Sequence, residues 1–340
     1  MEFDLNNDQK EIKSVARELL TARSPFAKVR AAAEAAQPDE ALRHELVSLG
    51  WPGIAVAEEH GGQGLGFVEL AVLLEELGYA CAASPFLGSA VAAAVIQACG
   101  SDAQRSRWLP GLASGTVTAG VGTRDLVVDA RPGVDVIAVI DGDEASLVTA
   151  PQVEVLDVID STRQFGRLGG GQAEPLEAGA AGRVYAALAA EVVGLAQRAL
   201  EMTLEYVKDR KQFGVPVGSF QAVSHRCAQM LLHTESARSA AYYAAWAADA
   251  DPSRLGEAAA MAGACAADGG REVTASAIQA HGGIGFTWEA DVHWLYKRAQ
   301  LDAALLGGST RHRAALARAA AEAATGAAET PEGASSREST

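Results

Sequence analysis

The spacing of apolar residues in the first third of the chain predicts a series of short amphipathic helices. Asn7 or Asp8 can cap a first helix that reaches about Thr21. Its apolar stripe consists of Ile12, Val15, Leu19 and Leu20. Helical periodicity returns at residues 38–49, 69–79, 88–99 and 103–109, and the Gly-rich stretch 51–66 predicts a loop. These segments together predict a helical N-terminal domain over residues 1–114.

After residue 115, apolar and polar residues begin to alternate, as in a β-strand. Two apolar runs, 135–140 and 146–150, flank Asp141-Gly142, which predicts a hairpin with an Asp-Gly turn. Residues 153–159 form a further β-rich run. We therefore expect a small, mostly antiparallel β domain over residues 115–176.

Helical spacing resumes after the β domain and predicts a helical C-terminal domain over residues 177–326. The expected helices cover residues 182–210, 219–248, 252–282, 287–306 and 309–324, with Ser219 and Thr287 as N-caps of the second and fourth. Val223, Met230, Leu231 and Ala237 should share one face of the second helix. The polar stretch Thr325–Thr340 is expected to be disordered, with a tail domain over residues 327–340. The fold class is thus mainly α with a small β domain.

Charge and composition narrow the function classes. The formal net charge is −15, and the absence of any Lys/Arg cluster in the sequence argues against nucleic-acid binding. The four cysteines are scattered without a CxxC spacing, as expected for small buried residues in a reducing compartment. The acidic N-terminus has no signal-peptide core, and the most apolar run, 87–99, is too short to span a bilayer. We expect a cytoplasmic protein that contacts no membrane.

A glycine turn between two predicted helices is the first candidate binding element. Gly282, Gly283 and Gly285 lie between Gln279 and the helix expected from Thr287. Exposed amides beside a helix N-terminus suit a phosphate or pyrophosphate. A glycine C-cap between two helices explains the same residues without a ligand. Arg210, at the end of another predicted helix, could bind a pyrophosphate or simply complement the helix dipole.

These elements occur in an order that resembles the acyl-CoA dehydrogenases, flavoproteins that desaturate acyl-CoA thioesters between Cα and Cβ. The matching C-terminal segments are Gly194-Leu-Ala-Gln-Arg-Ala199, Arg210-Lys-Gln-Phe-Gly214, Phe220-Gln221 and Gln279–Phe286. The N-terminal ones are Gly50-Trp51-Pro52, Glu58–Gly66 and Glu75-Glu-Leu-Gly78. The resemblance implies FAD as cofactor, an acyl-CoA substrate and an electron-transfer flavoprotein as acceptor.

The resemblance also implies which residues serve a flavin. In the family, the ADP half of FAD reaches across a dimer interface to the neighbouring subunit. The elements that hold it there match, in this chain, Arg210, Gln212, Phe213, Gln279, Gly282, Gly283 and Gly285. We call these seven residues the nucleotide clamp.

The family's catalytic base has no counterpart in this sequence. A glutamate usually takes the α-proton, and its place here falls on Leu306 or Gly307; an alternative family position falls near Val184. Glu191, on the same helix, is a weak candidate for a displaced base, although an interface charge explains it as well. Asp302 is expected to pair with Lys297 or Arg298.

The residues that hold the flavin ring are also missing. The segment Thr118–Asp125 has no Glu-Pro, and no Trp or Tyr lies between Trp108 and Tyr185. We therefore predict the non-catalytic subunit of a heteromeric acyl-CoA dehydrogenase, which resembles the α2β2 enzymes of actinobacteria that shorten steroid side chains. The alternatives are a self-sufficient homomer that uses Glu191, and a scaffold subunit that binds no flavin.

Overall fold

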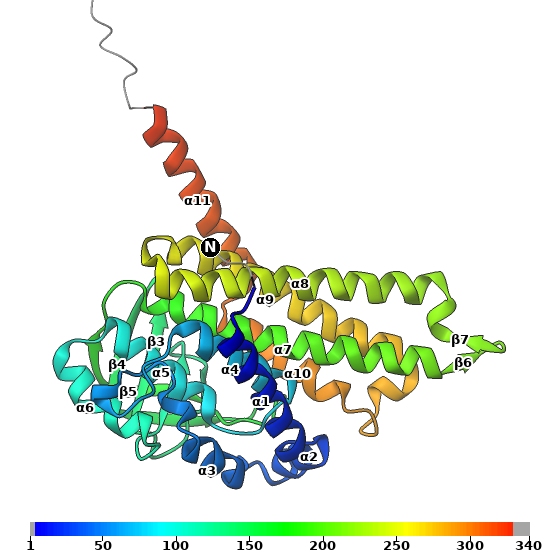
Figure 1. Cartoon of the computed structure of the whole chain (residues 1–340), viewed down its shortest axis with the longest axis horizontal. Helices are drawn as coiled ribbons and strands as arrows, with labels where there is room; N and C mark the ends of the chain where they lie inside the picture. The colour runs from blue at the N-terminus through cyan, green and yellow to red at the C-terminus, as the bar shows by residue number, and fades with distance from the viewer. Residues whose placement is uncertain (1–3, 329–340) are drawn as a thin grey trace, which may run out of the picture.

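The computed structural model describes residues 4–328, with side chains described through residue 324. This range contains eleven α-helices and seven strands, which confirms the predicted class of a mainly α protein with a small β domain (Figure 1). The first six helices are α1 (Asn7–Arg23), α2 (Phe26–Ala35), α3 (Glu40–Ser48), α4 (Phe67–Tyr79), α5 (Phe86–Cys99) and α6 (Asp102–Ala113). Sequence analysis missed α2.

Local capping explains where the first helices begin. Asn6, one residue earlier than expected, forms a reciprocal capping box with Gln9 at the start of α1. Leu20 is buried, but Val15 is 54% exposed, so the predicted apolar stripe of α1 is wrong at that position. Asp39 caps α3 by accepting a hydrogen bond from the Leu42 amide.

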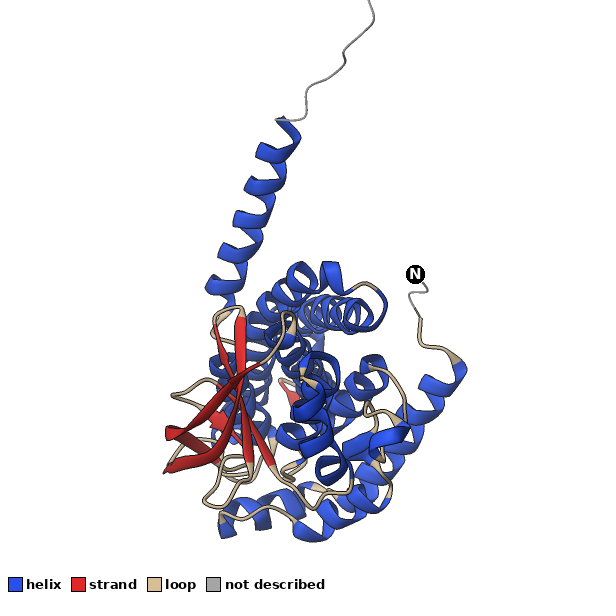
Figure 2. Ribbon diagram, turned by 90° about the vertical axis from the view of Figure 1, so that its left-hand side faces the viewer, coloured by secondary structure: helices blue, strands red, loops and turns tan. Residues whose placement is uncertain are grey.

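The β domain is a closed five-stranded barrel on one side of the molecule (Figure 2). Its strands, in the order β1-β2-β5-β4-β3, are β1 (Ala119–Gly122), β2 (Val127–Val128), β3 (Val136–Asp141), β4 (Glu144–Leu156) and β5 (Phe165–Pro175). The predicted hairpin is β3–β4, but Asp141 pairs with Glu144, so the turn residues are Gly142 and Asp143. The run 153–159 is not a separate strand, because β4 continues to Leu156.

The barrel departs from the expected sheet in two further ways. β1 pairs with β3 in parallel, although the other ladders of the barrel are antiparallel. The Gly-rich strand β5 was not predicted, because glycine weakens the alternating signal of a strand. Inside the barrel, a small apolar cluster contains Val127, Ile137, Val139, Val148 and Leu168.

Long helices form the C-terminal part and extend past the rest of the body (Figure 1). They are α7 (Ala180–Asp209), α8 (Gln221–Ala250), α9 (Leu255–His281), α10 (Val292–Leu305) and α11 (Ser309–Ala328). The residues expected to be disordered include Thr325 to Ala328, which belong to α11; residues 329–340 lie outside the described part of the chain. On α8, Met230 and Ala237 are buried as expected, but Leu231 is 51% exposed.

Two predicted N-caps in this part are wrong. Ser219 lies in a 3-10 turn, and Phe220 precedes α8 without a side-chain cap. Thr287 lies five residues before α10 and donates its hydroxyl to the Ile284 carbonyl. Both hydroxyls bond turns before the helix rather than its first amides.

The cysteines form no disulfide in the part of the chain that the structure describes. All four cysteines are free; Cys81, Cys99 and Cys227 are buried and Cys265 is half-buried. Among residues 4–324, no group of three His, Cys, Asp or Glu side chains could hold a metal ion. A search of the described helices finds none long and apolar enough to cross a membrane.

Candidate functional site

A small hairpin at the end of α7 carries three of the clamp residues. Arg210 ends α7, and β6 (Lys211–Gln212) and β7 (Val215–Pro216) follow as a two-stranded sheet at the far end of the molecule (Figure 1). Phe213 has a left-handed backbone with φ 53° and is 93% exposed. Arg210 and Gln212 are also exposed. The hairpin therefore presents a guanidinium and a bare aromatic ring outward, as a surface for another molecule would require.

Gln279 lies in the last turn of α9, and the other three clamp residues belong to the glycine turn that follows. It is a 3-10 turn, η5 (Gly282–Phe286), that directly follows α9. A Cβ atom at Gly282 or Gly283 would meet no atom within 4 Å, whereas one at Gly285 would lie 2.4 Å from the Ile278 carbonyl oxygen. The first two glycines thus leave open space for a ligand, and Gly285 is required by packing.

The expected helix N-terminus beside this turn is absent. α10 begins at Val292, so its first amides do not adjoin Gly282 and Gly283. The helix-dipole argument for anion binding at the turn is therefore wrong. Any affinity of this turn for a phosphate has to come from its own exposed amides and from nearby cations.

An open pocket of about 590 Å³ joins the hairpin side of the site to the end of α9. Its walls are one face of α7, the α9 terminus, Phe26 and Asp291. The α7 wall consists of Arg198, Met202, Glu205, Tyr206, Asp209 and Arg210, and the α9 wall is His281. The structure thus brings Arg210 close to the segment that holds Gln279 and the glycines.

Sequence analysis missed Tyr206 and His281. Their rings stack with centroids 4.4 Å apart and an interplanar angle of 20°. Tyr206 precedes Arg210 by four residues, so helical periodicity places both on the same face of α7. That spacing was a usable signal, but the contact of Tyr206 with His281 depends on helix packing.

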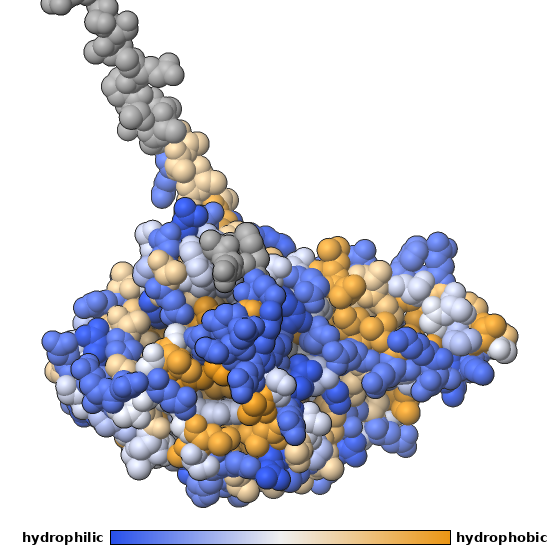
Figure 3. Space-filling model, viewed as in Figure 1, coloured by the Kyte–Doolittle hydropathy of each residue, from blue (hydrophilic) through white to orange (hydrophobic). Residues whose placement is uncertain are grey.

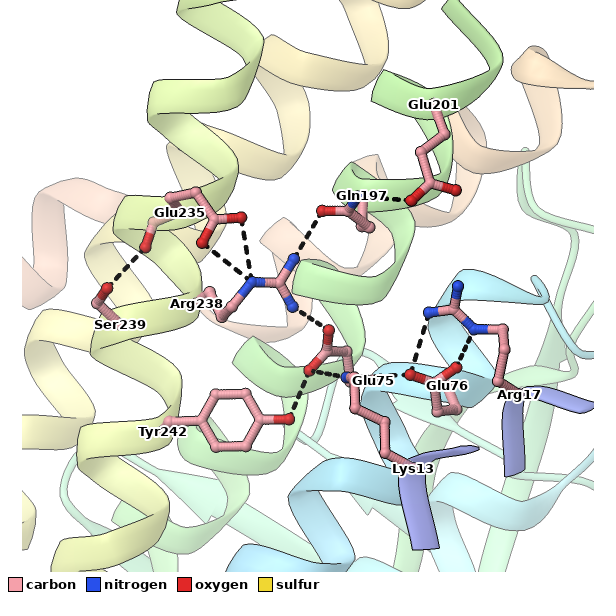
Figure 4. Close-up of polar contacts among 10 residues, drawn as sticks. All are labelled: Lys13, Arg17, Glu75, Glu76, Gln197, Glu201, Glu235, Arg238, Ser239 and Tyr242. Atoms are coloured by element: carbon pink, nitrogen blue, oxygen red, sulfur yellow. Dashed lines mark hydrogen bonds and ion pairs between the residues drawn. The ribbon is translucent and has the colours of Figure 1, made fainter. Parts of the chain in front are cut away.

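A polar network fixes α7 against the N-terminal helices (Figure 4). Glu75 and Glu76 of α4 are each 1% exposed, and Lys13 of α1 lies 2.8 Å and 3.0 Å from their carboxylates. Arg238 of α8 contacts Glu75 and donates to Gln197 of α7 at 2.7 Å. Four helices therefore meet at this buried pair of carboxylates, and α7 is positioned relative to the rest of the fold.

Glu191, the weak candidate base, lies in a different buried network. It is 3% exposed, and its carboxylate lies 2.8 Å from Arg163 and 3.7 Å from Arg298. Arg163 also contacts Asp302 at 2.5 Å and Asp160 at 3.5 Å. Two guanidiniums thus pair with the carboxylate of Glu191, and the protein encloses its side chain almost completely.

Asp302 pairs with Arg163, so the expected pair with Lys297 or Arg298 is wrong. Arg298 instead donates to the Ala82 carbonyl at 2.9 Å and contacts Thr162. The five charged residues at the junction of the barrel with α7 and α10 are Asp160, Arg163, Glu191, Arg298 and Asp302, which we call the junction network. All five are at most 7% exposed, so side chains fill this junction.

The positions that match the family's base carry no titratable group. Leu306 is fully buried, and Gly307 has φ 78°. Val184, at the alternative position, is also fully buried. None of these three positions offers a side chain that could accept a proton.

Burial should make the junction network sensitive to pH. Burial raises the pKa of Asp302 to about 7, although Arg163 opposes the shift, and burial raises the pKa of Asp129 to about 6. Oδ2 of Asp302 is buried and has no hydrogen-bond partner among the described residues, so a proton can reside there. A carboxyl with a raised folded-state pKa stabilises the fold below its unfolded pKa, and this stabilisation is lost as pH rises through the folded value.

We therefore expect the free energy of unfolding to fall between pH 5 and pH 7.5. Denaturant titrations at several pH values in that window should show the decrease, and Asp302→Asn should make it shallower because one of the two titrating carboxyls is gone. Glu235→Gln, on the exposed side of α8, should leave the slope unchanged. An Asp302→Asn variant with the wild-type slope would contradict the shift.

Comparison with known proteins identifies the family. Models of the acyl-CoA dehydrogenase N-terminal and C-terminal domains match residues 6–116 and 181–321. The chain is 37% identical to acyl-CoA dehydrogenase IpdE2 of Mycobacterium tuberculosis over 273 residues, which cover 79% of this chain and 83% of that protein.

Two solved structures have the same fold over nearly their whole length. A Tcur3481-Tcur3483 steroid ACAD variant is 28% identical with a TM-score of 0.82, covering 94% of this chain and 99% of that one. The ChsE4-ChsE5 complex from Mycobacterium tuberculosis is 25% identical with a TM-score of 0.82, covering 97% and 100%. The chain described here therefore belongs to the acyl-CoA dehydrogenases, a family of FAD-dependent oxidoreductases.

Proposed function

We propose that this chain is the non-catalytic subunit of a heteromeric acyl-CoA dehydrogenase, and that its nucleotide clamp holds the ADP half of the partner subunit's FAD. One contrast carries the proposal: Arg210 of the clamp lines an open pocket, whereas buried side chains fill the junction beside the barrel and the base positions carry no titratable group. Arg210 and Phe213 are exposed, and Gly282 and Gly283 leave open space.

The clamp chemistry fits the nucleotide part of FAD. A guanidinium such as Arg210 can bind a pyrophosphate through two parallel hydrogen bonds, and an exposed ring such as Phe213 can pack beside a planar base. Exposed amides of the glycine turn add further donors. When bound, FAD supplies the hydride acceptor; the residues of this chain would only hold its nucleotide end in place.

The junction of the barrel with α7 and α10 supports the second half of the proposal. In the family the flavin ring lies against the β domain, but here the junction network fills the space between the barrel and these helices. A planar ring system could enter only by displacing buried, mutually paired charges. The residues present therefore do not fit a flavin ring in this chain's own domain.

The comparisons also suggest a substrate class. The relatives include a steroid ACAD complex of two chains and the two-chain ChsE4-ChsE5 complex. We extend the proposal to an acyl-CoA with a steroid side chain as its acyl group, and to an electron-transfer flavoprotein as the acceptor of the complex.

Purification tests the proposal. The chain expressed alone should carry no flavin, and it should yield a yellow complex with about one FAD per pair of chains when co-expressed with a full-length acyl-CoA dehydrogenase encoded beside it. The measurement is the flavin-to-protein absorbance ratio. A yellow, active preparation of this chain alone would favour the homomer, and a partner whose flavin content does not depend on this chain would favour the scaffold.

Arg210→Ala should weaken FAD binding in the co-expressed complex by about 10- to 100-fold, because a charge-assisted pair to the pyrophosphate is lost. Fluorescence titration of the deflavinated complex with FAD measures the change. Arg107→Ala is a matched control, since this exposed arginine lies on α6, at the opposite end of the molecule from the hairpin (Figure 1). Equal FAD affinity in the Arg210 variant and the wild type would refute the clamp.

Glu191→Gln should leave turnover of the complex within about twofold of the wild type. The junction network has three carboxylates for two guanidiniums, so the loss of one negative charge should be tolerated. Steady-state assays with an artificial electron acceptor measure the effect. A loss of about 100-fold or more, as expected for a general base, would revive the self-sufficient homomer.

A further inference from the structure

The stacked pair Tyr206 and His281 adds to the pocket beside Arg210 two residues that are not among the seven of the clamp. His281 is only 8% exposed, and its ring, in the α9 wall of the pocket, lies nearly parallel to that of Tyr206 in the α7 wall. The stack holds the plane of the imidazole, and a ring flip within that plane would break the contact of Nδ1 with the Ala277 carbonyl. The position of both ring nitrogens is therefore restricted.

One hydrogen bond sets the tautomer of His281. Its Nδ1 lies 2.8 Å from the Ala277 carbonyl oxygen, which can only accept, so Nδ1 carries the hydrogen. Burial lowers the pKa of His281, and the ring is neutral at pH 7. Nε2 therefore has a free lone pair, and among the described residues no group donates a hydrogen bond to it.

The rest of the pocket favours a ligand with two different ends. Arg198 and Arg210 offer positive charge, but Glu205 and Asp209 line the same face of α7. An anion alone would meet these carboxylates, whereas a nucleotide can direct its phosphates to a guanidinium and the N–H groups of its base to the acceptors. The free Nε2 is such an acceptor, on a ring that is already held in place.

We propose that His281 recognises the adenine of the partner subunit's FAD, with Nε2 accepting a hydrogen bond from the adenine 6-amino group. The inference rests on the proposed function of the clamp and adds a residue that selects the base. Arg210 would then determine affinity for the pyrophosphate, and His281 would determine which base is accepted.

The test compares FAD with its deaminated analogue, in which hypoxanthine replaces adenine. The deflavinated co-expressed complex should bind FAD about tenfold more tightly than the analogue, as expected for one hydrogen bond to a buried acceptor. His281→Phe keeps an aromatic ring on Tyr206 but removes the acceptor, so the two flavins should bind with equal affinity. Tyr206→Phe, which preserves the stack, should retain the tenfold preference.

Other outcomes separate this inference from the clamp itself. If Arg210→Ala weakens both flavins but His281→Phe keeps the preference for FAD, only the role of His281 is refuted. If the Phe variant does not fold, His281→Gln, whose side-chain oxygen can accept, should keep part of the preference, and its full loss would count against the proposal. CoA also contains an adenine nucleotide, so the same variants are titrated with CoA. If His281→Phe weakens CoA binding but leaves FAD binding unchanged, the assignment of His281 to the adenine of FAD is overturned.

Discussion

Replacing Arg163 by methionine should lower the free energy of unfolding by about 3–5 kcal/mol, because it leaves Glu191 and Asp302 buried without their shared cation. Arg163 is 7% exposed and contacts three carboxylates, from its own loop, α7 and α10. Methionine fills most of the volume of the arginine side chain, so the lost stability reflects the missing charge more than a packing defect. Urea titration monitored by circular dichroism measures the difference.

A matched control and a double variant identify the cause. Arg167→Met removes an arginine that is half exposed and contacts Glu154 at 3.2 Å, and it should cost at most about 1 kcal/mol. Adding Asp302→Asn to Arg163→Met should recover part of the lost stability, since one orphaned carboxylate disappears. A single variant as stable as the Arg167 control, or a double variant with strictly additive losses, would show that the junction network is not coupled as described.

The junction network also shows what local sequence patterns cannot predict. Arg163 meets Glu191 and Asp302 at sequence separations of 28 and 139 residues, so no helical or strand spacing connects them. Lys297 and Arg298 lie about one helical turn before Asp302, so helical spacing predicted one of them as its partner. At the buried junction, Arg298 instead contacts the Ala82 carbonyl and Thr162, and Asp302 pairs with Arg163.

The long helices and the barrel hairpin were predictable because each has a strong period of its own. α7 and α9 agree with their expected ranges within two or three residues. α2 was missed because it is short and Ala-rich, and its buried residues Val29, Ala32 and Ala33 give only a weak stripe. Strand β5 was missed for a similar reason, since three consecutive glycines interrupt it.

Sequence motifs predicted the clamp residues of the candidate site, but they could not predict contacts that depend on helix packing. The motifs gave the seven clamp residues, and the structure places Arg210 in a pocket that also contains His281, two residues after Gln279. The expected helix at Thr287 failed because residues 287–291 form turns that no strong breaker signals. The stack of His281 on Tyr206 requires two helices to meet, which neither helix reveals alone.

The buried acidic pair of α4 gives a structural reason for the segment Glu75-Glu-Leu-Gly78. Both carboxylates contact cations from other helices (Figure 4), and Gly78 lies where α4 approaches α7. A Cβ at Gly78 would lie 2.1 Å from the Glu191 carbonyl oxygen. The motif thus fixes the distance between two helices, and through α7 it fixes the base of the hairpin that carries Arg210, Gln212 and Phe213.

The apolar surface of the C-terminal part fits a protein partner. Several large exposed hydrophobic side chains belong to this part, among them Phe213, Leu231, Leu232, Phe286 and Trp288. Figure 3 shows hydrophobic side chains at its surface. Exposed aromatic residues at such density are typical of interfaces rather than of free surfaces. In the proposed heteromer, the partner subunit would cover these side chains.

The closest approach of two helices predicts the second large effect, at Gly194. A Cβ at this position would lie 1.9 Å from the Glu75 carbonyl oxygen and 2.5 Å from the Tyr79 amide nitrogen, so Gly194→Ala must push α4 away from α7. Neither backbone atom can rotate aside, and we expect a loss of about 3 kcal/mol in the free energy of unfolding. Gly256→Ala, also in a helix but with no atom within 4 Å of the new Cβ, should be neutral or slightly stabilising. Because α7 carries Arg210 and Tyr206, the Gly194 variant should also bind FAD more weakly in the complex, whereas a variant with wild-type stability would mean that α4 and α7 can separate without cost.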